Sequence, residues 1–245
     1  IKKQKKIFED FIEKHQPEII LIQETNLKPN TRFSIKNYNT IRNDRTTAQR
    51  GGTATLIKQN IKFTHTDTNK EDETEITIFT KNRKKLTIIN KYISPNINFK
   101  REDFKELMRN RKNTMIIGDL NAKDRTWGCN SNNTRGKYLK EVIEKRANTQ
   151  IIATTNATRI DPNGRDDILD IAIAIDMKSN IKMRTLKQLE SDHLPVKITI
   201  KTNIDNTIIS KMNKKEINWK NMRTELNKHE VIEYTNNTQI IEQNT

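Results

Sequence analysis

Polar side chains of the types that catalyse hydrolysis follow or interrupt several apolar runs of this chain. They are Glu24 after "IILIQ", Tyr92 near the end of "TIINKYIS", Asp119 and Asn121 after "MIIG", Asp170 within "ILDIAIA", and Asp192 and His193 before "LPVKITI". Carboxylates that meet at one edge of a sheet repel one another unless a cation neutralises them. Oxygen ligands in a chain with 1 cysteine and 4 histidines favour a hard ion, Mg²⁺ or Mn²⁺.

This set of groups fits the hydrolysis of a phosphodiester. The reaction needs a metal ion on the phosphate, an activated water and a stabilised leaving oxygen. Taken singly each motif is weak, because Asp119 and Asn121 could equally cap a turn where a strand stops. The occurrence of all the motifs in this order, each beside an apolar strand, favours the catalytic interpretation.

The apolar runs predict the elements that must position these groups. Helical spacing is expected over residues 5–14, 98–110 and 136–146, and strands over 18–24, 51–58, 74–80, 85–94, 114–121, 150–155, 168–176 and 191–201. The runs 74–80 and 85–94 are separated by a short basic turn and predict a hairpin. Strands with interspersed helices predict an α/β or α+β fold with a mixed sheet.

Composition restricts the class of protein. A chain of 245 residues fits one large domain with an appendage, and a single cysteine, Cys129, excludes an intramolecular disulfide and an all-cysteine zinc site. The formal charge of +15 favours a polyanionic partner such as nucleic acid, although an AT-rich genome or an unspecialised basic surface would also raise it. No apolar run reaches about 18 residues and the first residues are charged, so we expect neither a membrane span nor a signal peptide.

Several motifs together resemble a known family. "LIQET", "GDLNA" and "SDHLPV", in this order, resemble the endonuclease/exonuclease/phosphatase superfamily, which includes the apurinic-site DNA endonucleases. "RGGTATLIK", "GDLNAKDRTWGC", "TRGKYLKEVI" and "ILDIAIA" are more similar to the endonuclease domain of non-LTR retrotransposons of the jockey type. The resemblance extends from about residue 7 to about residue 200.

The resemblance implies a four-layer sandwich of two mixed β-sheets flanked by helices, and it assigns roles to single residues. The implied principal metal ligand is Glu24. Asp192 is implied to contact the metal or its water. The implied catalytic groups are Tyr92 at the phosphate or leaving group, Asp119 at the attacking water, Asn121 at the phosphate, and Asp170, which fixes the imidazole of His193. In the family a hairpin enters DNA where this chain has Arg159 and Arg165, and these could equally be solvated turn charges.

The resemblance also implies a function and a domain organisation. We expect residues 1–202 to form a Mg²⁺-dependent endonuclease that nicks double-stranded DNA and leaves a 3′-hydroxyl to prime reverse transcription. Family members begin with a strand that carries an asparagine, so this domain is expected to lack that first strand. Residues 203–245 are expected to be a tail or linker toward a reverse transcriptase, with synthesis in the cytoplasm and action in the nucleus. The alternatives are a decayed DNA-binding module and another phosphodiesterase of the superfamily.

Overall fold

The computed structural model describes residues 5–47, 50–80, 84–161, 163–188 and 191–201. Its helices are α1 (Lys5–His15), α2 (Arg101–Met108), α3 (Thr134–Glu144) and the 3₁₀ helix η2 (Arg125–Trp127). Its strands are β1 (Ile19–Gln23), β2 (Tyr38–Asn43), β3 (Thr53–Lys58), β4 (Phe63–Thr66), β5 (Glu73–Phe79), β6 (Lys85–Lys91), β7 (Thr114–Asp119), β8 (Thr149–Ile152), β9 (Asp170–Ile175), β10 (Ile181–Thr185) and β11 (Val196–Ile200). The expected tail at 203–245 lies outside the described residues, so the domain boundary stays a prediction.

A six-stranded mixed sheet forms the centre of the fold. Its order is β4-β5-β6-β7-β9-β8, and β6 and β7 run parallel while the other neighbours run antiparallel. The predicted hairpin is confirmed, because β5 pairs with β6 in a register that sets Ile76 opposite Ile88. Alternation along β9 sends Ile171 and Ile173 to one face of the sheet and Ala172 to the other.

A second layer of strands packs on one face of this sheet. It consists of a three-stranded sheet, β1-β3-β2, and a two-stranded sheet, β10-β11, each antiparallel within the described residues. Buried side chains between the two layers include Ile57, Ile76, Met115 and Ala172. The predicted α/β sandwich is confirmed, with the difference that the second layer is two antiparallel sheets here rather than one mixed sheet.

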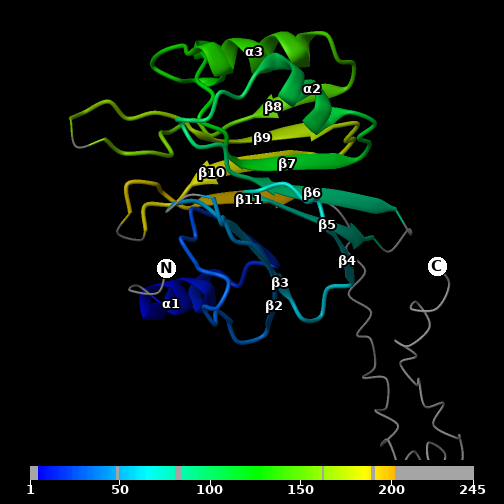
Figure 1. Ribbon diagram of the computed structural model, residues 1–245, viewed down its shortest axis with the longest axis vertical. Coiled ribbons are helices and arrows are strands. Elements are labelled where there is room, and N and C mark those ends of the chain that lie inside the picture. The colour runs from blue at the N-terminus through cyan, green and yellow to red at the C-terminus, as the bar shows by residue number, and fades with distance from the viewer. Residues whose placement is uncertain (1–4, 48–49, 81–83, 162, 189–190, 202–245) are drawn as a thin grey trace, which may run out of the picture. The chain divides into compact units, whose positions relative to one another are not determined.

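Helices cover the two outer faces, which completes four layers (Figure 1). Phe104 of α2 and Leu139 of α3 are fully buried against the six-stranded sheet. On the opposite side, Ile12 of α1 packs with Leu56 of β3. None of the helices in the described residues has the length and apolar character that a membrane crossing requires.

Several predicted boundaries differ from the structure; among them, the strands expected at 85–94 and 150–155 end at Lys91 and Ile152. The expected helix at 98–110 is shorter, at Arg101–Met108, and the helix expected from residue 136 begins at Thr134. The side chain of Asn133 accepts a hydrogen bond from the Gly136 amide at 2.7 Å and caps that helix earlier than the apolar spacing indicated. The run 191–201 becomes a strand only at Val196. Strands β2, β4 and β10 were not predicted.

Candidate active site

The polar residues singled out in the sequence gather at one end of a cavity between the two strand layers. Glu24 follows β1, Asp119 ends β7 and Asp170 begins β9, and the antiparallel register sets Asp119 directly opposite Asp170. The cavity has a volume of about 700 Å³, and its polar end is lined by these three carboxylates together with Asp192 and His193. The topology therefore brings together residues that are up to 169 positions apart (193 − 24).

Glu24 and Tyr92 form one side of the site. Tyr92 directly follows β6, and its hydroxyl donates a hydrogen bond to the Glu24 carboxylate. Burial, followed by the Glu24 carboxylate, raises the pKa of Tyr92, so the phenol keeps its proton and remains a donor. Buried Asn90 ties β1 to β6 behind this pair, since its amide group accepts from Gln23 Nε2 at 2.6 Å and donates to the Ile22 carbonyl at 3.2 Å. Asn90 was missed in the sequence, although an amide inside an apolar run is a visible signal.

Two glycines hold the backbone that follows Glu24. The carbonyl of Gly52 accepts from the Thr25 amide at 3.1 Å, and the Gly52 amide donates to Asp72 Oδ1 at 2.6 Å. Gly51 and Gly52 have φ of +128° and +83°, and a Cβ at Gly51 would lie 2.8 Å from Asp72 Oδ1. Because a side chain cannot fit there, the "RGG" motif lets this turn approach the strand that carries Glu24.

Asp119 is held at the end of β7 by its own turn. The Asn121 backbone amide donates to Asp119 Oδ1 at 3.0 Å, and the Asn121 side chain donates to the Ile93 carbonyl at 3.2 Å. Gly118 has a φ of +152°, and a Cβ there would collide with the Lys91 carbonyl. The turn-capping and the catalytic interpretations are therefore compatible, because one carboxylate oxygen caps the turn while the other faces His193.

His193 lies between two carboxylates. Its Nδ1 is 2.9 Å from Asp170 Oδ2, and its Nε2 is 4.0 Å from Asp119 Oδ2. Burial lowers the pKa of His193, but the hydrogen bond with Asp170 and the charges of Asp170, Asp119 and Asp192 outweigh burial and raise the pKa to about 9. Burial and the charge of Asp170 raise the pKa of Asp119 to about 7. The imidazole is therefore a cation at neutral pH, and 4.0 Å leaves its Nε2–H free to bind an incoming oxygen.

The remaining predicted residues lie at the rim of the site or beyond it. Asp192 has a side chain that is 63% exposed, and Arg159 Nε lies 3.7 Å from its Oδ2. The backbone of Arg159 bridges to His193, which places its loop beside the site. Arg165 is exposed farther along the same loop, which projects from the end of the six-stranded sheet between β8 and β9 (Figure 1). The structure thus brings Arg159 to the site and leaves Arg165 on the loop surface.

The donor set of the cavity fits a divalent cation. Glu24 and Asp170 act to raise the pKa of Asp119 while His193 acts to lower it, so the carboxylates here outnumber the imidazole that faces them. Within the described ranges no three His, Cys, Asp or Glu side chains are grouped closely enough to hold an ion by themselves. Mg²⁺ usually takes one or two protein carboxylates and completes its shell with water and substrate phosphate. Glu24 and Asp192, which both line the cavity, remain the candidate ligands.

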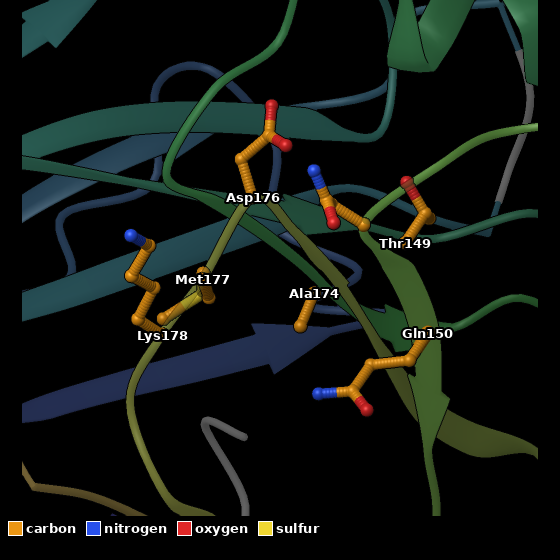
Figure 2. Close-up of a pocket in the computed structure, with 7 residues that line it drawn as sticks. Thr149, Gln150, Ala174, Asp176, Met177 and Lys178 are labelled. Atoms are coloured by element: carbon orange, nitrogen blue, oxygen red, sulfur yellow. The ribbon is translucent and has the colours of Figure 1, made fainter.

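A second hollow lies at the opposite end of β9 and lacks these groups. It has a volume of about 380 Å³ and is lined by Asn148, Thr149, Gln150, Ala174, Asp176, Met177 and Lys178 (Figure 2). Asp176 and Lys178 supply its only charges. With one carboxylate and no histidine, its lining offers no paired acid and base, so the cavity at Asp119 and His193 is the candidate active site.

Comparisons with known proteins agree with this geometry. Residues 86–197 match the family described as "Endonuclease-reverse transcriptase". The chain is 30% identical over 115 residues to the probable RNA-directed DNA polymerase from transposon BS of Drosophila melanogaster. That alignment covers 45% of this chain and 13% of the polymerase, so the chain matches only a small part of its relative.

Solved structures share the fold. The endonuclease domain of TRAS1, a telomere-specific non-LTR retrotransposon, superposes with a TM-score of 0.64 at 16% identity, over 78% of this chain and 89% of that domain. A humanized D. rerio TDP2 superposes with a TM-score of 0.51 at 13% identity, over 79% and 89% of the two chains. The resemblance to retrotransposon endonucleases is confirmed by the family match and by the transposon polymerase, and the solved structures add that the fold is shared.

Proposed function

We propose that this chain is the endonuclease part of a retrotransposon protein and that it nicks one strand of DNA in the nucleus. The observation that carries the proposal is the Asp170–His193–Asp119 arrangement, which lines the same cavity as Glu24, the hydrogen-bond partner of Tyr92. The match to the endonuclease-reverse transcriptase family supports a nuclease, and it also supports continuity with a reverse transcriptase. The nick leaves a 3′-hydroxyl that primes reverse transcription.

The geometry supports hydrolysis by an activated water. The oxygen of a water attacks phosphorus and its proton passes to the Asp119 carboxylate. The bond from phosphorus to the 3′-oxygen breaks, and the departing 3′-oxygen takes a proton from solvent water to become the 3′-hydroxyl. The His193 imidazolium, held by Asp170, stabilises the negative charge that develops on the phosphate oxygens. The phosphate is bound and oriented by Asn121, in the loop after β7, and by Tyr92, in the loop after β6. When bound, Mg²⁺ or Mn²⁺ at Glu24 and Asp192 supplies positive charge to the phosphate.

Metal removal tests the ion. Because the donor set consists of carboxylate and amide oxygens, we expect the protein to nick supercoiled plasmid in the presence of Mg²⁺ or Mn²⁺. Nicking should stop when EDTA is added. An excess of Mg²⁺ over EDTA should restore the original rate, which shows that the chelator acts on the ion and not on the fold. Nicking that continues unchanged in EDTA would contradict the metal assignment.

Salt dependence tests the substrate class. A domain with a formal charge of +15 that neutralises several DNA phosphates should bind with a slope of log K against log[salt] of roughly −0.9 per phosphate. Arg159→Gln, at the rim of the site, is expected to reduce that slope by about 1. Lys178→Gln, in the second hollow, is the matched charge control and should leave the slope unchanged. Fluorescence anisotropy with a DNA duplex measures the slope for the parent protein and for the two variants. A flat salt dependence in the parent protein would favour a small phosphodiester as the substrate.

A further inference from the structure

The first turn of α3 binds the backbone of the loop that carries Asn121. The Asn133 side chain donates to the Asn121 carbonyl at 2.9 Å and accepts from the Lys123 amide at 3.0 Å. The Lys123 carbonyl in turn accepts from the Asn133 amide at 3.0 Å. At Gly136 a Cβ would collide with the Lys123 carbonyl, so the helix can lie this close only with glycine at that position.

Arg135, in the same turn, binds two loops at once. Its side chain is buried, with an exposed fraction of 8% for the residue. The guanidinium donates to carbonyls of Leu120 and Asn121 at 3.4 and 3.3 Å, and of Ser94, Pro95 and Ile97 at 3.0, 3.4 and 2.6 Å. The first two belong to the Asn121 loop (residues 120–123) and the other three to the Tyr92 loop (residues 92–99).

The guanidinium of Arg135 carries a buried positive charge close to the site. In the part of the chain that the structure describes, the hydrogen bonds of its guanidinium go to backbone carbonyls and not to a carboxylate. Burial lowers the pKa of Arg135, while Asp119 and Tyr92 act in the opposite direction. Burying a cation without a carboxylate partner costs free energy even when carbonyls accept all its hydrogen bonds. Such a cost favours a role for Arg135 in holding those carbonyls in place.

We propose that Asn133, Arg135 and Gly136 form a bracket that fixes the Tyr92 loop against the Asn121 loop, with Arg135 as the positioning residue for nicking. The catalytic part of this inference rests on the proposed function. The Asn121 side chain already joins the two loops through the Ile93 carbonyl at 3.2 Å, and Arg135 adds contacts to both loops beyond the strand ends. The planar guanidinium reaches both loops from fixed directions, which a flexible ammonium cannot do.

Kinetics of paired variants test the positioning role. Arg135→Met is expected to lower the single-turnover nicking rate by about 100-fold, since a misplacement of about 1 Å can have that effect, and to change the Kd for DNA by less than about twofold. Arg135→Lys keeps the charge without the fork and should remain at least about tenfold below the parent protein. Arg146→Met and Arg146→Lys are matched controls, because Arg146 beyond the far end of α3 donates to the Arg111 carbonyl at 3.0 Å. Both controls should nick within about twofold of the parent.

Hydrogen exchange tests the bracket without reference to activity. In Arg135→Lys, which keeps the charge, amide exchange at Ile97, Asn121 and Lys123 should accelerate together by about tenfold or more, and Arg146→Lys should leave these amides unchanged. Acceleration in one loop only, or none, would overturn the bracket; accelerated exchange with full nicking in Arg135→Lys would overturn the positioning role. If the parent protein does not nick, the proposed function fails, while the exchange result still decides whether the bracket exists.

Discussion

Replacing His193 by alanine is expected to lower the nicking rate by roughly 10²- to 10⁴-fold and to leave DNA affinity nearly intact. The imidazolium is held by Asp170 at 2.9 Å, and its other nitrogen faces the space beside Asp119. In the proposed mechanism its charge stabilises the negative charge of the transition state, so its loss should affect the chemical step more than binding. Asp119→Ala is expected to have an effect of the same order, because it removes the proposed base for the attacking water.

The measurement compares single-turnover nicking rates with the Kd for the same DNA at one salt concentration. His65→Ala is the matched control, since His65 is exposed on β4 and is absent from the cavity lining. It should nick within about twofold of the parent protein, and all variants should melt cooperatively. A His193 or Asp119 variant that nicks within a few-fold of the parent would show that its role is misassigned.

The site was predictable to the extent that it depends on strand ends. Glu24, Asp119 and His193 each stand next to an apolar run, and neighbouring strands of a layered fold bring such ends to one edge. Arg135 and Asn90 could not be assigned in the same way, because their partners are carbonyls and amides from distant segments. Periodicity tells which residues are buried, but it does not identify the backbone groups that a buried polar side chain meets.

Two of the three strands that sequence reasoning missed have a physical reason in common. In β2 and β4, polar residues predominate and partly exposed positions are frequent, so their pairing with β3 and β5 holds them in place more than their own pattern does. Strand β10 is different, because Ile181 and Met183 alternate with exposed Lys182 and Arg184 and gave a readable signal. The α/β class was predicted correctly because β7 and β9 come from long apolar runs. Tertiary packing does not override so strong a sequence pattern.

The expectation that the domain lacks a first strand stays a prediction, and the geometry of the cavity shows where a strand would fit. In the described residues β1 pairs with β3 on one edge and β11 pairs with β10, and the other edges carry no strand partner. Both strands line the apolar part of the 700 Å³ cavity, together with Ile88 and Met183. Unpaired strand edges beside buried apolar surface are costly, because their N–H and C=O groups lose partners.

A strand appended before α1 is therefore expected to stabilise the domain. Strand β1 ends at the site and β11 leaves from it, so a strand between them would run parallel to β1 and antiparallel to β11. Helix α1 provides the crossover that parallel strands require, since its 11 residues span about 16 Å, which is close to the length of a strand of about five residues. Each buried Ile or Val side chain would contribute about 1.5–3 kcal/mol before the loss of chain entropy is subtracted.

The test compares two extensions of equal length, roughly 10 to 15 residues, added before Ile1. One carries an apolar β-branched strand followed by a turn, and its control is a Gly/Ser sequence. A net gain of about 2 kcal/mol would raise the Tm by roughly 4–8 °C for a domain of this size, and the control should not change it. If both extensions leave the Tm where it was, the free edges of β1 and β11 do not accept a strand. If both raise it equally, the gain does not come from strand pairing, because a Gly/Ser chain has neither the propensity nor the side chains to fill the cavity.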